Sequence, residues 1–461
     1  MAISDRRGLE ITADDKTAVA HYEAAVEHYL GFRPDTVRPL KAALEAEPTL
    51  FMAQVLQGYF YLLMANAALE PKVAKTIAGA APTANRVSAR ERVHLAALEA
   101  WHKGDLPTAT ARWEAILIDH PRDILALKLA HFTHFYLGDT DSLRDSIARV
   151  SHAWDEAVPG YGFVLGMYAF GLEEGGEYAA AERTGRHAVA LNPADIWAVH
   201  SVAHVMEMQG RHREGMAWLD TTREGWRGCN NFTYHLWWHW ALYHLELRQH
   251  DAALALYDRA VREDRSDFYL DIVNAASLLW RLELLGVDVG ERWQELAETS
   301  ATRIHDRMLA FVDTHFIMAL AGAGERATAR RMFRAQRGSA ADATTTAAAV
   351  TAAVGLPVAQ ALLAYRDGDY GRVVDLLIPL RNQFRRLGGS HAQRDVFTLT
   401  LIEASLRAGR FTLARGLLAE RTARRPKSAP SWEGYARALD GLGDASAAAA
   451  ARATAAALVA A

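Results

Sequence analysis

The chain has 461 residues and a formal net charge of −4, a balance without the basic excess that nucleic-acid binding requires. Hydrophobic residues make up 51% of the sequence and charged residues 23%, a globular composition that excludes a disordered protein. The densest basic run, residues 421–427, is short and indicates a solvated helix end rather than a phosphate track.

Cys229 is the single cysteine, so neither a disulfide framework nor a cysteine-based metal site can form. One unpaired thiol fits a reducing compartment. Residues 1–16 lack the apolar h-region of a signal peptide, and we identify no run of about eighteen strongly apolar residues. We therefore expect a cytoplasmic protein with no membrane partner.

A turn signature recurs along the chain, in which a helical pattern ends in glycine or a polar residue and another helical pattern soon begins. In chain order the signatures fall at Gly104, Gly138, Gly176, Gly210, Gln249, Gly324, Gly368, Gly409 and Gly443. Most are spaced near the tetratricopeptide unit of about 34 residues. The one long interval, from Gln249 to Gly324, indicates a further turn that lacks the signature. A left-handed glycine ends the first helix of each hairpin and turns the chain back.

Alternating strand patterns are not apparent between these turns. The predicted fold is therefore all-α, a tetratricopeptide-like α–α superhelix built as a solenoid of helical hairpins. Residues 339–354, rich in alanine and threonine, predict a surface loop running into a helix. We place a soft seam there, between an N-terminal superhelix (1–340) that carries the candidate site and C-terminal repeats (341–461) packed on it as one continuous solenoid.

Two neighbouring repeats place polar side chains on the helix face that lines the concave surface of such a solenoid. Residues three or four apart share this face because of the 3.6-residue helical period. The residues are Trp197, His200, His204 and Glu207 in one repeat, and His235, His239 and Tyr243 in the next. A third segment, before Gly324, places Asp313 and His315 near the same groove with a less regular register.

This pattern suits acid–base chemistry, since a histidine oriented by Asp313, Asp306 or Asp271 acts as a general acid or base near neutral pH. The candidate catalytic residues are His200, His204, His239, Asp313 and His315. The candidate ligand-binding residues are Trp197, Glu207, His235, Tyr243, Asp271, Arg281, Asp306 and Arg394.

A divalent metal is the alternative use of the same side chains. His200 and His204, four residues apart on one helix, can chelate one ion with His239 as a third ligand. The segment HSVAH lacks the glutamate of the HExxH zinc-protease motif, so that mechanism fails at its general base. The sequence therefore predicts no cofactor, with a metal held by these histidines as the open alternative.

The segment LGGSHAQRDVF (387–397) breaks the repeat pattern. Two glycines before a polar helix start suit an anion or carboxylate at the helix N-terminus. The alternative is structural: Arg394 and Asp395 belong to a network that holds two repeats together. The sequence does not separate these interpretations.

Several long segments resemble the tetratricopeptide repeat protein 38 family: WAVHSVAHVMEMQG, HLWWHWALYHLE, FVDTHFIMAL and GGSHAQRDVF. The resemblance runs from about residue 20 to about residue 425. It implies a stand-alone helical-repeat protein without an established activity, and it extends to His200, His204, His239, Asp271, Arg281, Asp306, Asp313, His315, Gln393, Arg394 and Asp395. Asn274 departs from the family pattern, where we expect aspartate, and this weakens a metal or acid–base role.

Two function classes follow. In the first, the superhelix closes around a His/Asp-rich pocket that binds a small polar ligand and supports acid–base, hydrolytic-type chemistry, with or without a metal. Trp197, Trp237 and Tyr243 would supply its apolar wall. The alternative is a non-catalytic scaffold that holds a peptide or protein in an open groove. A carboxylate-clamp groove needs Lys, Arg and Asn at concave positions, where histidines and aromatics stand here. A homodimer is compatible with either class.

Overall fold

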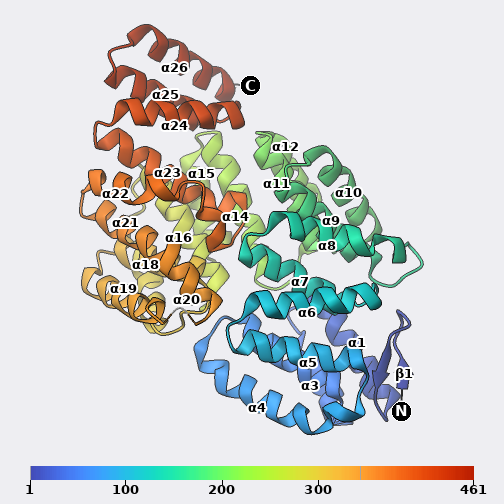
Figure 1. Cartoon of the computed structure of the whole chain (residues 1–461). Coiled ribbons are helices and arrows are strands. Elements are labelled where there is room, and N and C mark those ends of the chain that lie inside the picture. The colour runs from blue at the N-terminus through green and yellow to red at the C-terminus, as the bar shows by residue number, and fades with distance from the viewer. Residues whose placement is uncertain (1, 343, 461) are drawn as a thin grey trace.

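The computed structural model describes residues 2–342 and 344–460, and it is almost entirely helical (Figure 1). The only strands among these residues, β1 (Ala2–Ser4) and β2 (Glu10–Thr12), form a short antiparallel hairpin at the N-terminus. The predicted all-α, tetratricopeptide-like superhelix is confirmed. Position 343, within the predicted loop 339–354, lies outside the described residues.

Antiparallel helical hairpins follow one another along the whole chain. They are α1 (Lys16–Leu30) with α2 (Val37–Ala46), α3 (Phe51–Leu63) with α4 (Glu70–Ala80), α5 (Ala89–His102) with α6 (Leu106–Asp119), α7 (Ile124–Leu137) with α8 (Thr140–Val150), α9 (Tyr161–Glu174) with α10 (Tyr178–Leu191), α11 (Ile196–Met208) with α12 (His212–Thr221), α14 (Phe232–Glu246) with α15 (His250–Leu256), α16 (Tyr269–Leu284) with α17 (Trp293–Thr302), α18 (Ala310–Gly322) with α19 (Arg326–Ala340), α21 (Leu356–Arg366) with α22 (Tyr370–Leu377), α23 (His391–Arg407) with α24 (Phe411–Arg424), and α25 (Ala429–Gly441) with α26 (Ala445–Ala460). Shorter pieces are α13 (Arg223–Trp226), α20 (Thr346–Val350) and η8 (Phe384–Leu387).

The turn glycines identified from the sequence adopt the left-handed conformation, with φ between 66° and 83°. At the Gln249 turn the left-handed residue is Arg248, with a φ of 58°. The turn hidden in the long interval is Gly286, with a φ of 81°, between α16 and α17. Phe32 and Ala65 are also left-handed and end the first helices of two N-terminal hairpins that the turn signature does not reveal.

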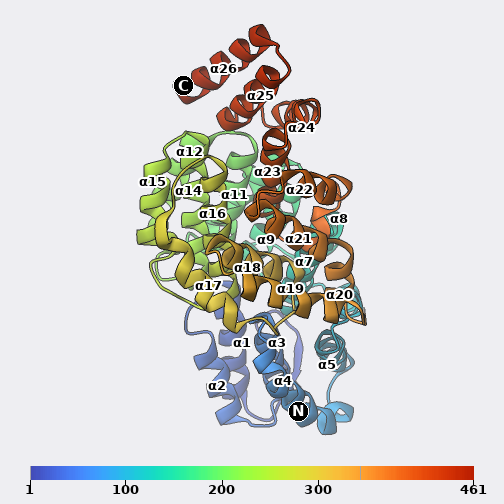
Figure 2. The same cartoon turned by 90° about the vertical axis from the view of Figure 1, so that its left-hand side faces the viewer.

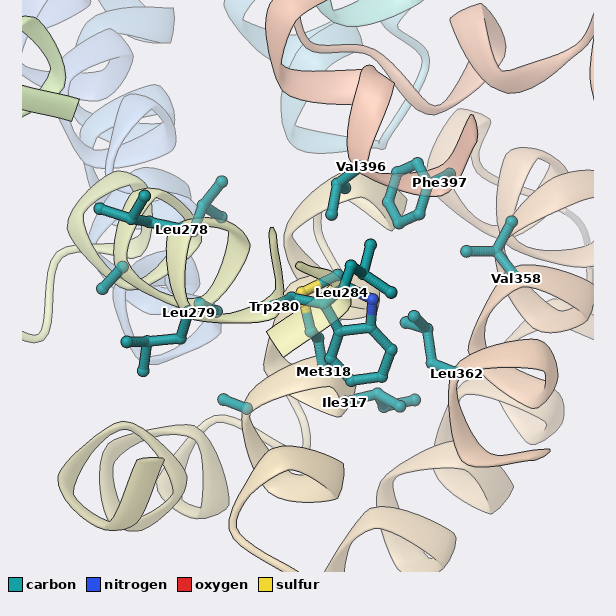
Figure 3. Close-up of a cluster of buried hydrophobic side chains, with 14 of the residues drawn as sticks. Leu278, Leu279, Trp280, Leu284, Ile317, Met318, Val358, Leu362, Val396 and Phe397 are labelled. Atoms are coloured by element: carbon teal, nitrogen blue, oxygen red, sulfur yellow. The ribbon is translucent and has the colours of Figure 1, made fainter. Parts of the chain in front are cut away.

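The first helices of consecutive C-terminal hairpins share a continuous apolar core. Figure 3 shows Trp280 of α16, Ile317 of α18, Leu362 of α21 and Phe397 of α23 pointing toward one another. Each is at most 1% exposed. Fully burying a large apolar side chain stabilises the fold by about 1.5–3 kcal/mol. The core therefore continues across residue 340 without a break.

The C-terminal half folds back onto the turns of the N-terminal half, which closes the superhelix (Figures 1 and 2). Thr346 donates its backbone N–H to the carbonyl of Gly104 at 2.9 Å. The carbonyl of Arg385 lies so near Gly138 that a side chain there would collide with it. His391 at the start of α23 donates its backbone N–H to Glu174 Oε1 of α9 at 2.8 Å. The concave face is therefore covered along part of its length.

The surroundings of α23 bear on two sequence predictions, the solvated helix end at residues 421–427 and the two interpretations of segment 387–397. Arg421 was expected at a solvated helix end, but it is 9% exposed and donates to both oxygens of Asp395 at 2.6 and 2.7 Å. Arg394 donates to Glu174 Oε2 at 3.3 Å. The polar start of α23 thus forms a network between repeats, which favours the structural interpretation of segment 387–397.

One continuous helical stretch, Thr346–Arg366, is long and apolar enough by composition to span a membrane, although the sequence inspection identified none. Half of its apolar window is buried inside the fold, and core helices pass the same test. In the fold it packs on α18, α19 and α22. Packing within the repeats accounts for its composition.

A candidate ligand site: four buried histidines beside an aromatic cavity

Local sequence sets the start of the helix that carries the first two histidines. Asp195 caps α11, because its Oδ1 accepts the backbone N–H groups of Trp197 and Ala198, both at 3.1 Å. His200 and His204 then lie one turn apart on the inward face. The neighbouring helix α14 presents His235 and His239 with the same spacing, and the two helices pack side by side.

These four side chains, which we call the histidine cluster, are at most 2% exposed. The ring centroids of His200 and His204 are 4.4 Å apart, as are those of His204 and His239. The Nε2 atoms of His200 and His235 are separated by 3.1 Å. The predicted convergence of histidines from two repeats is therefore present as one compact group.

Three of the rings have an oxygen atom beside Nδ1, which is a hydrogen-bond partner for His239 and His235 and an ion-pair contact for His204. His239 Nδ1 lies 2.8 Å from Glu207 Oε2, and His235 Nδ1 lies 2.9 Å from Asn274 Oδ1. His204 Nδ1 lies 3.4 Å from Glu173 Oε2. Asn274, the departure from the family pattern, thus orients a member of the cluster.

Burial keeps most of the cluster uncharged. It lowers the pKa of His200, His235 and His239 well below the usual histidine value, and the neighbouring imidazoles add to this shift. Burial also opposes the charged form of His204, but Glu173 outweighs it and raises the pKa of His204. Burial raises the pKa of Glu173 in turn. Burial therefore favours the uncharged form of His200, His235 and His239, whereas Glu173 favours a proton on His204.

His200 and His235 form part of the wall of a cavity of about 470 Å³. Twelve other lining residues carry Phe, Tyr or Trp rings, from helices that include α1, α3, α7, α11, α14, α16 and α18, and from the segments beside them: Tyr29, Phe32, Phe60, Tyr61, Phe132, Phe135, Tyr136, Trp197, Phe232, Phe268, Tyr269 and Phe311. The first helices of these hairpins thus face the cavity, as the repeat pattern predicts. Val37 and Met64 are 67% and 44% exposed and form an apolar rim.

Three buried polar atoms of cavity-lining residues lack a hydrogen-bond partner within the described chain: Nδ1 of His200, the hydroxyl of Tyr29 and Nε1 of Trp197. The hydroxyls of Tyr136 and Tyr269 satisfy each other at 2.7 Å. Buried polar atoms are normally paired. These three unpartnered atoms therefore indicate where the polar part of a bound molecule would form hydrogen bonds.

A buried lysine that the sequence analysis did not single out lies beside the cavity. Lys128 Nζ stands 4.7, 4.3 and 4.9 Å from the ring centroids of Phe32, Phe132 and Trp197, all cavity-lining residues. Burial lowers the pKa of Lys128 to about 7 and raises that of Asp195 to about 6. One charged residue in an apolar helix start, LALKLAHF, is the sequence signal that could have found it.

Some predicted site residues join the cluster or the cavity and others do not. The ring centroids of Trp197 and His200 are 5.0 Å apart, and Glu207 Oε2 lies within hydrogen-bond distance of His239 Nδ1. Tyr243 is a packing residue whose hydroxyl donates to the carbonyl of Ala203 at 2.7 Å. Asp271 accepts from Asn231 Nδ2 at 2.6 Å at the start of α16, and burial raises its pKa to about 6.

Asp313 and His315 are buried on α18, and each has its own surroundings away from the histidine cluster. His315 Nδ1 lies 2.8 Å from the carbonyl of Phe311, and burial lowers its pKa to about 4. Burial raises the pKa of Asp313 to about 7, with a contribution from Asp306. Asp306 itself pairs with Arg303. Among the described residues, Asp313, His315 and Asp306 therefore contact other groups, and the predicted grouping of Asp313 and His315 with the histidine cluster is wrong.

Arg281 and Arg394 connect repeats. Arg281 donates to the carbonyl of Ala392 at 2.6 Å and to Ser277 Oγ at 2.9 Å, joining α16 to α23. It also lines a second cavity of about 280 Å³, on the Glu207 side of the histidine cluster. Arg394 binds Glu174, as described above, and serves the closure of the superhelix.

No family model matches this chain, so the resemblance to the tetratricopeptide repeat protein 38 family stays a prediction. Similar solved structures include the human IFIT1 dimer with PPP-AAAA, with a TM-score of 0.35, 13% identity, and coverage of 98% of this chain and 96% of that one. Yeast Tom70 has a TM-score of 0.33 and 13% identity over 97% and 93%. The TPR domain of P58(IPK) has a TM-score of 0.22 and 11% identity over 80% and 92%. These values carry no argument about ligands.

Proposed function

We propose that this protein binds a small molecule in the aromatic cavity, with an apolar body against the rings and one polar end at His200 and Tyr29. The observation that carries the proposal is that Nδ1 of His200, the hydroxyl of Tyr29 and Nε1 of Trp197 are buried without partners in a wall rich in aromatic side chains. The volume of about 470 Å³ falls in the range of about 300–1,000 Å³ that suits small ligands. The sequence predicted a small polar ligand, and the mostly apolar lining now favours a ligand that is apolar over most of its length.

The protonation states favour a neutral polar end, such as a hydroxyl, carbonyl or protonated acid. Burial lowers the pKa of His200 and favours its uncharged form, in which the unpartnered Nδ1 can donate or accept one hydrogen bond. Neutral imidazoles can also move a proton to or from a bound hydroxyl or carbonyl. Acid–base chemistry on that polar end is the catalytic extension of the proposal.

The alternative, a scaffold for an extended peptide, has less support. Such a groove must stay open along several repeats. Here the start of α23 hydrogen-bonds to α9, and Arg385 abuts Gly138, so C-terminal segments occupy part of the concave side. The rim at Val37 and Met64 suits entry of a small apolar molecule.

Binding of the neutral fluorophore N-phenyl-1-naphthylamine to the full chain tests the cavity. We expect one site per chain and at least a tenfold loss of affinity in Leu270→Trp, because Leu270 lines the cavity and the larger ring would fill it. Leu191→Trp is the matched control, since Leu191 is 40% exposed on α10 and does not line the cavity. Equal binding by both variants would refute the cavity as the site.

A second comparison tests the polar end. His200→Leu should weaken binding of 1-naphthol by about 2- to 12-fold, the worth of one hydrogen bond, and leave naphthalene binding nearly unchanged. The two ligands differ only in the hydroxyl. An equal effect on both would show that His200 contributes shape and not a hydrogen bond.

A further inference from the structure

The inward-facing nitrogens of the histidine cluster are spaced like the ligands of one metal ion. One candidate ligand atom from each of His200, His204, His235 and His239 lies within 4.8 Å of all the others. Two imidazole nitrogens at about 2.0–2.1 Å from a shared tetrahedral ion stand about 3.3 Å apart. The separation of 3.1 Å between the Nε2 atoms of His200 and His235 is already close to that value.

The Nδ1 contacts of His204, His235 and His239 place Nε2 of each of these three rings on the inner side of the cluster, where Nε2 of His235 lies 3.1 Å from Nε2 of His200. When Nδ1 of His239 and Nδ1 of His235 donate hydrogen bonds to Glu207 and Asn274, the Nε2 atoms of these rings carry the lone pairs. A proton on His204 Nδ1, which faces Glu173 at 3.4 Å, leaves the lone pair of that ring on Nε2 as well. Metal-binding histidines characteristically donate their other ring N–H to a carboxylate or carbonyl in this way.

Some ring nitrogens of the histidine cluster have no hydrogen-bond partner among the described protein atoms. Nε2 of His204 and Nε2 of His239 are buried without a hydrogen-bond partner in residues 2–342 and 344–460. Two carboxylates, Glu173 and Glu207, are also buried against the cluster, at 0% and 6% exposure. Converging lone pairs beside buried acidic groups are satisfied together by a bound cation.

We propose that His200, His204, His235 and His239 bind one divalent first-row transition-metal ion, with Glu173, Asn274 and Glu207 orienting the rings. Imidazole ligands select zinc, iron, copper or nickel, whereas magnesium and calcium require oxygen ligands. A second grouping, Glu173, Glu174 and His204, is less suited because Glu174 already binds His391 and Arg394.

The ion would lie at the wall of the aromatic cavity, because His200 and His235 line it. Its use as a Lewis acid toward a polar ligand end rests on the proposed function. Metal binding itself does not rest on it, and the two proposals can fail separately. Leu270→Trp fills the cavity and replaces none of the four histidines, so it should lower fluorophore affinity at least tenfold and leave Co²⁺ affinity unchanged.

Titration of chelator-treated, untagged full-length protein with Co²⁺ tests the site. We expect one ion per chain, with visible d–d absorption of tetrahedral intensity, displaced by Zn²⁺. His239→Gln should lower the affinity at least 100-fold. The matched control is His187→Gln, because His187 is half-exposed on α10 and its nearest acidic partner is Glu156.

Glu207→Gln keeps all four ligands and removes only the charge that orients His239, so a 10- to 100-fold weaker Co²⁺ affinity is expected. If circular dichroism shows that His239→Gln does not fold, the Co²⁺ affinity of Glu207→Gln tests the metal site instead. Absence of Co²⁺ absorption in the wild-type protein would overturn the proposal. So would unchanged binding in Glu207→Gln, or equal losses in the His239 and His187 variants.

Discussion

Replacing Gly138 with alanine tests whether the C-terminal half is docked on the N-terminal turns. Gly138 is left-handed, with a φ of 67°, and an added Cβ would lie 2.0 Å from the carbonyl oxygen of Arg385. Left-handed alanine costs about 1–2 kcal/mol. Displacing the backbone at Arg385 adds about 1–3 kcal/mol, the usual cost of overpacking. Gly138→Ala should therefore lower the free energy of unfolding by about 2–5 kcal/mol.

Gly176→Ala is the matched control, since Gly176 ends the corresponding turn with a φ of 83° and nothing lies within 4 Å of its added Cβ. Only the conformational cost of about 1–2 kcal/mol applies there. Guanidinium unfolding gives the two losses. Hydrogen exchange of residues 384–391 should accelerate in Gly138→Ala alone. Equal losses in both variants, with unchanged exchange, would refute the closed superhelix.

Three further substitutions address other buried charges. Asp123→Asn leaves the Arg90 guanidinium, 2.6 Å from Asp123 Oδ2, without its partner, and should cost about 3–5 kcal/mol in guanidinium unfolding at pH 7; a loss under about 1 kcal/mol would contradict this. Asp313 has its pKa raised to about 7 by burial, so the folded state retains a proton that the unfolded chain loses above about pH 4. Stability should fall by up to about 4 kcal/mol as pH rises from 4 to 7, and Asp313→Asn should flatten this profile of unfolding free energy; an unchanged slope would argue against it. Glu174→Gln should cost about 1.5–3 kcal/mol and speed hydrogen exchange at the start of α23, because Arg394 loses its carboxylate; unchanged exchange would count against this contact.

The repeat architecture was predictable because its turns depend on one local requirement. A left-handed residue is most easily glycine, so Gly104, Gly176 and Gly210 mark their hairpins directly in the sequence. The two N-terminal hairpins escaped this test because their left-handed residues are Phe32 and Ala65. Tertiary packing overrides the backbone preference there, and no local pattern reveals it.

The histidine cluster was predictable for a similar reason. His200 and His204 share a helical face by their spacing, and equivalent positions in adjacent repeats must meet. The aromatic cavity could not be predicted from the sequence, because its wall includes residues as far apart in the chain as Tyr29 of α1 and Phe311 of α18. Such distant contacts depend on the curvature of the whole superhelix, which small rotations between repeats determine.

The register of the third predicted segment shows the limit of the periodic argument. Asp313 and His315 follow a long connection, and the turn at Gly286 within it carries no recognisable signature. His315 faces the carbonyl of Phe311 and the ring of Phe397 instead of the cluster. A residue that is one helical position off the shared face points into the core between hairpins.

A crystal of the full chain soaked with 4-bromophenol would locate a bound ligand and its orientation in one experiment. The anomalous signal of bromine should appear among the rings of the cavity, with the hydroxyl within hydrogen-bond distance of His200 Nδ1 or the Tyr29 hydroxyl. Bromine density absent from the cavity, or a hydroxyl directed to the rim at Val37 and Met64, would contradict the proposed ligand site.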